Sequence, residues 1–242
     1  MTKTIKYNKH LVYHHCESKH FDEISFYYLL KVLFNNSRIY NFKSYKLHQQ
    51  LRAFKYIPHT LTAKKVSDYT NYMIENKLAE IRDNHLHLSS LQSDSYYSSK
   101  ITLPEITTYK AIRELITLEL LKYQQYNQQK AITYREKIVT KTNKHKRLSV
   151  NEEIYIKSES YFSKNLITYR TIANNLSISL KTAFILVQSL IEQKKVSFET
   201  ITINTGIPVS CNFEYIIQSL KMYSYVSGGF LFQILGSSFK VI

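Results

Sequence analysis

Hydrophobic residues in the first ninety positions recur at steps of three and four, the period of a helix that buries one face. Pro58 interrupts the pattern, because proline cannot donate a backbone hydrogen bond inside a helix. Thr60 or Thr62 can cap the helix that restarts after it. The pattern predicts three amphipathic helices, at residues 22–37, 44–54 and 62–76.

The third of these helices has two contrasting faces. Val66, Tyr69, Met73 and Ile74 form its apolar stripe and are expected to point into the core. The opposite face carries short and polar side chains, which can approach base edges and phosphates in a DNA major groove. The residues of this face are Lys64, Lys65, Ser67, Asp68 and Asn71.

A β-hairpin is predicted directly after the third helix. Asp83-Asn84 separates two short apolar runs, and both residues tolerate the positive φ values that a two-residue hairpin loop demands. Cross-strand geometry then fixes the register. It pairs Arg82 with His85, Ile81 with Leu86 on the core face, and Glu80 with His87 on the solvent face.

The middle of the chain begins with a predicted linker near residue 95. Ser89 to Ser99 lacks apolar periodicity, and Pro104 follows in a position typical of a first helical turn. Residues 106–126 then form an apolar helix that must be covered, either by its own domain, which is the expected case, or by a second subunit. The basic and amide-rich stretch at 122–147 is interpreted as a solvated loop.

Two alignments compete in the C-terminal third. In the first, Thr168 to Ala183 forms a helix–turn–helix, with Ser177 where many such motifs have glycine. Its second helix is apolar on nearly every side and is therefore expected to be buried. In the second alignment, Leu180–Gln193 is instead the buried first helix of a unit that continues to the C-terminus.

The two alignments can coexist if the Leu180–Gln193 helix closes one unit and opens the next. The second alignment is favoured, because the parts that follow fit it. Phe198 to Pro208 is predicted to be a helix that ends at Gly206, since glycine takes the left-handed conformation at helix ends. Ser210 or Asn212 would cap a third helix, and Tyr225 to Phe232 is predicted to be a hairpin with Gly228-Gly229 at its tip.

Charge and composition narrow the function classes. The 242 residues include 33 Lys and Arg against 18 Asp and Glu, a formal net charge of +15, which favours a polyanionic partner, nucleic acid before membrane. All four glycines lie beyond residue 205, which excludes glycine-rich Walker and Rossmann phosphate loops before that point. Cys16 and Cys211 stand apart, and no apolar run exceeds five residues, so a reducing, cytoplasmic location is expected.

The order of helix, extended piece, two helices and hairpin over residues 22–88 resembles the winged helix–turn–helix family of DNA-binding proteins. The predicted fold class is mainly α with short β-hairpins, as tandem winged helices joined by a helical segment. The expected domains are an N-terminal winged helix (1–90), a helical linker or dimerisation segment (91–160) and a C-terminal helix–turn–helix or winged helix (161–242).

The resemblance implies sequence-specific binding of double-stranded DNA. Its tandem form is similar to plasmid and phage replication initiators, which bind direct repeats, and transcription regulators share the module. No catalytic residue, cofactor or metal is expected. A homodimer through Ile106–Tyr126 is the alternative to packing within the chain, and replication or transcription machinery is a candidate partner. The expected DNA contacts are Lys46, Thr62, Lys64, Lys65, Ser67, Asp68, Asn71, Arg82, His85, Arg170, Lys181, Asn212, Tyr215, Gln218 and Lys221.

Other functions are weighed against this one. The apolar helices also suit a protein-interaction module, since basic proteins from AT-rich genomes need not bind DNA. His85-Leu-His87 matches the His-hydrophobic-His pair of rolling-circle nicking endonucleases, but two histidines two apart on any strand share a face. The cluster His10, His14, His15, Cys16 and His20 has metal-like spacing, yet solvated histidines are the expected interpretation.

Overall fold

The structure is a computed structural model, and it divides the chain into two compact units. The first unit comprises Met1–Thr117 and Ala173–Leu186, and the second comprises Leu118–Ile172 and Val187–Ile242. The residues that the structure describes are 4–8, 12, 14–16, 18–34, 37–89, 98–102, 107–145, 166–208, 224–228 and 230–242.

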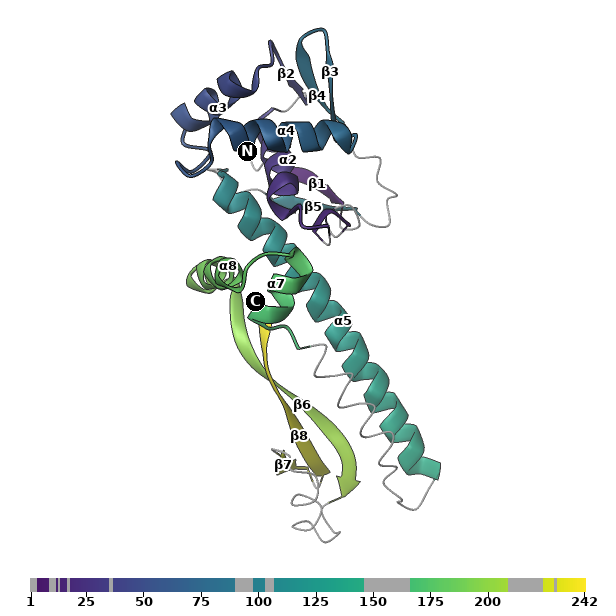
Figure 1. Ribbon diagram of the computed structural model, residues 1–242. Helices are drawn as coiled ribbons and strands as arrows, with labels where there is room; N and C mark the ends of the chain where they lie inside the picture. The colour runs from purple at the N-terminus through teal and green to yellow at the C-terminus, as the bar shows by residue number, and fades with distance from the viewer. Residues whose placement is uncertain are drawn as a thin grey trace. The chain divides into compact units, whose positions relative to one another are not determined.

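The first unit contains the three predicted helices and the predicted hairpin. Its elements follow one another as α2 (Phe21–Leu33), β2 (Arg38–Ile39), α3 (Ser44–Ala53), α4 (Ala63–Glu75), β3 (Ala79–Arg82) and β4 (His85–Leu88) (Figure 1). The three strands form one antiparallel sheet in the order β2-β4-β3. A second, two-stranded sheet pairs β1 (Thr4–Asn8) with β5 (Ser98–Thr102).

The core of this unit is the set of apolar stripes that the sequence predicts. α2 is buried on nearly all sides, and the ring of Phe26 packs at 5.6 Å from that of Tyr69 on α4. Val66 and Met73 are fully buried, as predicted, while Ile74 is only half-buried. Burying these side chains stabilises the unit by about 1.5–3 kcal/mol each.

The hairpin has the predicted register, and the φ values of Asp83 and Asn84 are +50° and +61°. One detail of the prediction is wrong. Leu86 on the central strand β4 is buried, but Ile81, its partner on the edge strand β3, is 53% exposed, and only Ala79 of β3 is buried.

α5 (Tyr109–His145) is longer than predicted, since residues 127–145, interpreted as solvated loop, continue the helix. Its first turn is fixed to the first unit: the Tyr109 amide donates to the Tyr56 carbonyl at 2.7 Å, and the Tyr109 hydroxyl donates to the Asp22 carbonyl at 3.1 Å. The apolar positions of the predicted 106–126 helix are largely buried within the chain, with Tyr123 and Tyr126 exposed.

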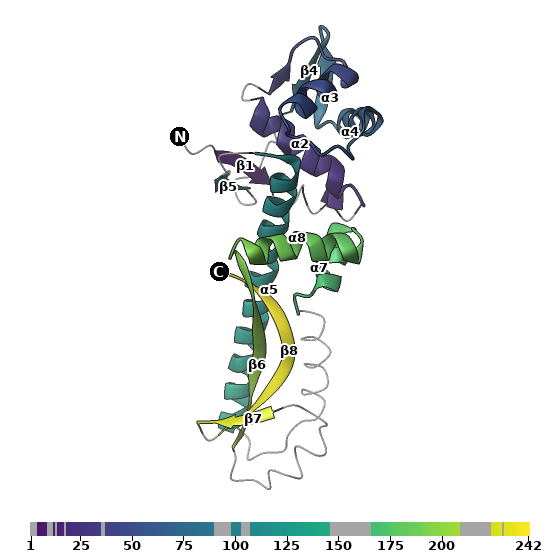
Figure 2. The same ribbon diagram turned by 90° about the vertical axis from the view of Figure 1, so that its left-hand side faces the viewer.

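The second unit includes a long antiparallel sheet beside α5 (Figure 2). Strands β6 (Val196–Pro208), β8 (Phe230–Val241) and β7 (Ser224–Ser227) pair in the order β6-β8-β7. Buried Ser238 joins them to their surroundings, because its hydroxyl accepts from Gln128 Nε2 at 3.2 Å and from the Ile167 amide at 3.0 Å. The predicted hairpin at 225–232 is confirmed as β7 and β8, with Gly228 at a φ of +57°.

Two C-terminal predictions are wrong. Residues 198–208 form strand β6 and not a helix, with partners in β8 as far as Pro208. The Leu180–Gln193 helix is present as α8 (Leu180–Glu192) but is not buried all round, since Leu180, Phe184 and Ile185 are 55%, 48% and 52% exposed. The predicted third helix at 212–223 lies outside the described residues.

α7 (Tyr169–Leu176) and α8 form the helix–turn–helix of the first alignment. Thr168 and Ser179 cap the two helices, because their side-chain oxygens accept from the amides of Thr171 and Thr182. Ser177 occupies the glycine position of the turn with a φ of +50°. The fold as a whole is mainly α-helical with antiparallel sheets, although β6 and β8 are not the short strands expected.

Non-glycine residues take the left-handed conformation at several turns. Four of them are lysines, and all four are exposed. These are Lys19, Lys55, Lys77 and Lys194.

Candidate nucleic-acid interface

The turn between α3 and α4 is held rigidly by short-range hydrogen bonds. The His48 side chain contacts the Leu61 carbonyl through Nε2 at 3.0 Å, and the Tyr56 amide donates to the Leu51 carbonyl at 2.9 Å. Lys55 turns the chain with a φ of +56°. α4 therefore begins at a fixed position relative to α3.

The first turn of α4 is a favourable place for an anion. Thr62 caps it, as predicted, because its hydroxyl accepts from the Lys65 amide at 3.3 Å. The remaining amides at a helix N-terminus carry partial positive charge and bind anionic groups. Lys64 and Lys65 add two exposed side chains, and neither forms an ion pair with another residue that the structure describes.

Further along α4, the polar face has the predicted orientation. Asp68 and Asn71 are exposed and Ser67 is half-buried, while the opposite stripe faces the core. Asn can form a bidentate pair with adenine, and Asp can accept from the amino group of cytosine. The helix thus presents cations at its beginning and exposed hydrogen-bonding side chains beyond them.

Positive charge around α4 is more extensive than the predicted contacts. Between Glu23 and Asp68 the sequence contains no acidic residue. It contains eight basic ones in that interval: Lys31, Arg38, Lys43, Lys46, Arg52, Lys55, Lys64 and Lys65. The predicted Lys46 is exposed, and so are Lys43, Arg52 and Lys55, which the helical pattern gave no reason to select. The acid-free interval is the signal that could have identified them.

The solvent face of the β2-β4-β3 sheet adds a second polar surface. Register places Arg38, His87 and Glu80 in one row across the three strands. Arg82 forms an exposed ion pair with Glu80 at 2.7 Å, so part of its charge is neutralised. His85 is half-buried, and its Nδ1 accepts from the Asn41 amide at 3.0 Å, which fixes the loop between β2 and α3.

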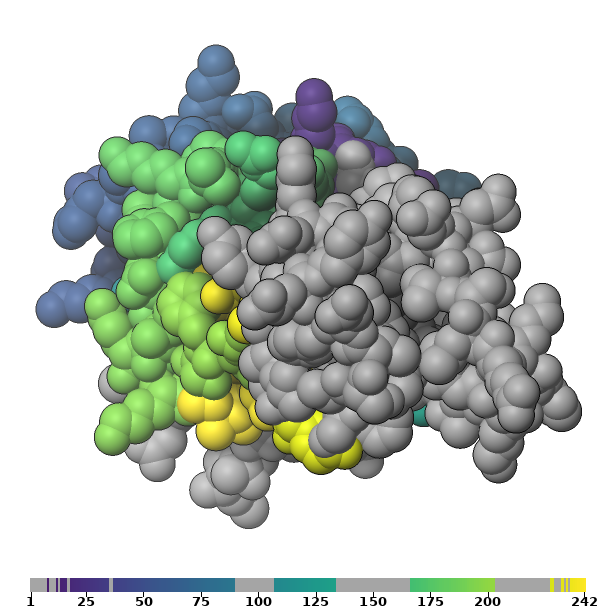
Figure 3. Space-filling view, turned by 90° about the horizontal axis from the view of Figure 1, so that it is seen from below, coloured from purple at the N-terminus to yellow at the C-terminus, as the bar shows by residue number. Residues whose placement is uncertain are grey.

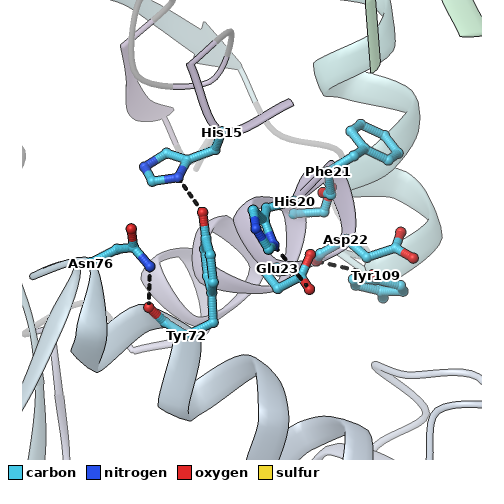
Figure 4. Close-up of polar contacts among 9 residues, drawn as sticks. His15, His20, Phe21, Asp22, Glu23, Tyr72, Asn76 and Tyr109 are labelled. Atoms are coloured by element: carbon cyan, nitrogen blue, oxygen red, sulfur yellow. Dashed lines mark hydrogen bonds and ion pairs between the residues drawn. The ribbon is translucent and has the colours of Figure 1, made fainter. Parts of the chain in front are cut away.

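The N-terminal histidines have a structural role in the described part of the chain (Figure 4). The interpretation of these side chains as solvated is wrong for His15, which is buried and bonded through Nδ1 to the Tyr72 hydroxyl on α4. Burial, helped by His14 and His20, lowers the pKa of His15 to about 4. His20 stacks on Tyr72 with ring centroids 4.0 Å apart and lies 3.4 Å from the Glu23 carboxylate. Neutral His15 therefore holds the end of α4.

The predicted C-terminal contacts divide into two groups. Arg170 on α7 and Lys181 on α8 are exposed. Lys181, however, shares its helix face with Leu180, Phe184 and Ile185, which are apolar and cannot hydrogen-bond to base edges. The other four residues lie outside the described part: Asn212, Tyr215, Gln218 and Lys221.

Comparison with known proteins gives no functional assignment for the chain, so any assignment has to be argued from the geometry described above. No known protein family, curated protein or solved structure matches the chain. Among the residues that the structure describes, no group of three or more His, Cys, Asp and Glu side chains is arranged to hold a metal ion. No helix there is long and apolar enough to cross a membrane.

Proposed function

We propose that the first unit is a winged helix–turn–helix that binds double-stranded DNA with sequence preference. The supporting observation is its element order: a covered helix α2, a short strand β2, the pair α3 and α4, and a hairpin whose sheet order is β2-β4-β3. In this arrangement α4 is the recognition helix and the β3–β4 hairpin is the wing.

The observation that carries the proposal is the placement of charge. The capped N-terminus of α4 and its two exposed lysines lie within the longest acid-free interval of the unit. Phosphate contacts supply most of the affinity of DNA-binding proteins, and base contacts supply the sequence preference. A cationic helix start followed by Asp68 and Asn71 meets both requirements.

We infer a related arrangement for the second helix–turn–helix, in which α8 occupies the position of a recognition helix and β6 and β8 that of a wing. Its exposed apolar side chains favour a second candidate function for this part, a protein contact. On this proposal the two ends of the chain have different partners. Arg170, which is exposed on α7, remains a predicted DNA contact.

Binding to labelled duplexes, measured by fluorescence anisotropy, tests the proposal. We expect affinity to fall with salt at a log–log slope of roughly −4 to −7, from contacts to about four to eight phosphates. Exchanging both lysines, Lys64→Glu with Lys65→Glu, should weaken binding to every duplex by about 30–100-fold, because two attractions become repulsions.

A matched control separates position from net charge. Lys194→Glu with Lys195→Glu makes the same change in charge at two adjacent exposed lysines that lie after α8. It should weaken binding by less than about threefold. Equal losses from the two double variants would show that net charge alone, and not α4, attracts DNA.

The biological role follows from where the protein binds. As a replication initiator of a plasmid or phage it would protect iterated repeats near an AT-rich origin. As a transcription regulator it would protect promoters. Footprinting on the source genome distinguishes the two, and protection of promoters alone would reject the initiator role.

A further inference from the structure

We propose that α8 is a homodimer contact, in which the exposed faces of two α8 helices pack antiparallel across a two-fold axis. The proposal concerns a different surface from the α4 face and does not rest on DNA binding. Figure 3 shows side chains of the green stretch that includes α8 at the molecular surface.

The exposed face of α8 is apolar in its N-terminal half and charged towards both ends. Ile185 is 52% exposed, and Leu180 and Phe184 beside it are 55% and 48% exposed. Exposed Lys181 lies at the N-terminal end of this stripe and exposed Glu192 at its C-terminal end. Neither forms an ion pair with another described residue.

The spacing makes this stripe complementary to itself. Lys181, Ile185, Gln188 and Glu192 follow steps of four, three and four, so they share one face of the helix. Eleven residues correspond to three turns within about 20°, and to a length of roughly 16 Å. When two copies pack antiparallel, Lys181 of one lies opposite Glu192 of the other, and Ile185 lies opposite Gln188.

Symmetry makes the same contact occur twice, as a two-fold interface requires. A parallel pairing would instead bring Lys181 to Lys181 and Glu192 to Glu192, which is repulsive. The charges of the stripe therefore select a second copy in the antiparallel direction. The competing dimer surface, the 109–126 part of α5, has its apolar positions largely buried, leaving Tyr123 and Tyr126 exposed.

Sedimentation equilibrium of the full chain, without DNA and at about 0.1 M salt, tests the proposal. The contact is small, so we expect a dissociation constant of roughly 1–100 µM. Ile185→Asp should raise it at least about tenfold, and the exposed position lets circular dichroism confirm that the variant remains folded. Lys181→Glu and Glu192→Lys should each raise it about 3–10-fold.

The combined variant, Lys181→Glu with Glu192→Lys, should restore the dissociation constant to within about threefold, because it exchanges the two charges and keeps them opposite. Lys194→Glu changes net charge as Lys181→Glu does and should have no effect. A monomer at all concentrations, no restoration by the combined variant, or loss of the dimer only in Tyr126→Ser would each overturn the proposal.

Discussion

α4 and α8 have the same length and follow a capped turn in the same way, yet they expose opposite chemistry. Each has 13 residues and begins after a hydroxyl cap, Thr62 in one and Ser179 in the other. α4 shows Lys64, Lys65, Asp68 and Asn71 to solvent, whereas α8 shows mainly Leu180, Phe184 and Ile185. The backbone motif is therefore not sufficient to define the partner, which depends on the outward face.

The largest expected difference between the two regions is a loss of folding stability in acid, which concerns the part of the chain that contains α4. His15 is neutral in the folded state, with its pKa lowered from 6.5 to about 4, and it bonds to Tyr72 on α4. An unfolded chain takes up this proton near pH 6.5. The contribution of neutral His15 to the free energy of unfolding is therefore complete above pH 6.5. About 1–3 kcal/mol of it is lost as the pH falls from 6.5 to about 4.

Thermal unfolding followed between pH 4.5 and 7 measures this loss. His15→Gln keeps a partner for the Tyr72 hydroxyl but cannot titrate, so its stability should depend less steeply on pH than that of the native chain. The chain has no histidine after His145, so amide protection factors in β6 and β8, which belong to the second unit, should change little over the same range. An unchanged slope in His15→Gln would contradict the role given to His15.

A second effect concerns sequence preference. Asn71→Ala should lower affinity for a preferred duplex by about tenfold while leaving affinity for random DNA within about twofold, because a base contact is lost and phosphate contacts remain. Asn174→Ala, at an exposed position of α7, is the matched control and should change neither. Anisotropy titrations with both duplexes measure it. Equal losses on the two duplexes would assign Asn71 to the DNA backbone.

The smallest effect distinguishes the turns that precede the two helices. Ser177 holds a φ of +50°, where a β-carbon is strained and glycine is not. Ser177→Gly should raise the free energy of unfolding by up to about 1 kcal/mol, reduced by the greater freedom of glycine in the unfolded chain. Urea denaturation measures this change. A loss of more than about 1 kcal/mol would show that the Ser177 side chain matters more than its backbone angle.

The sequence predicted the first unit well because its signals are local. Helical periodicity, the Thr62 cap and the Asp83-Asn84 turn are each properties of a few neighbouring residues. Ile81 was misplaced because its exposure depends on the place of β3 at the edge of the sheet, which the local pattern does not reveal. The cations around α3 were missed because periodicity identifies buried positions and is silent about exposed ones.

The C-terminal predictions failed where distant pairing decides the structure. Residues 200–203 alternate Thr with Ile, which is a strand pattern. The helix was predicted instead because Gly206 was interpreted as a helix end. Their partners in β8 lie thirty or more residues away in the sequence. α8 was expected to be buried because apolar composition does not reveal how many of its sides other elements cover.

The left-handed turns explain where part of the charge comes from. A chain with only four glycines fills these turns with other residues, and at Lys19, Lys55, Lys77 and Lys194 the substitute is a cation at an exposed corner. The basic side chains at these four corners accompany the turns, so their presence alone does not indicate a nucleic-acid site. For proteins of such composition, the isoelectric point would therefore overestimate the affinity for DNA. Long intervals without Asp or Glu are a better indicator of a DNA-binding surface.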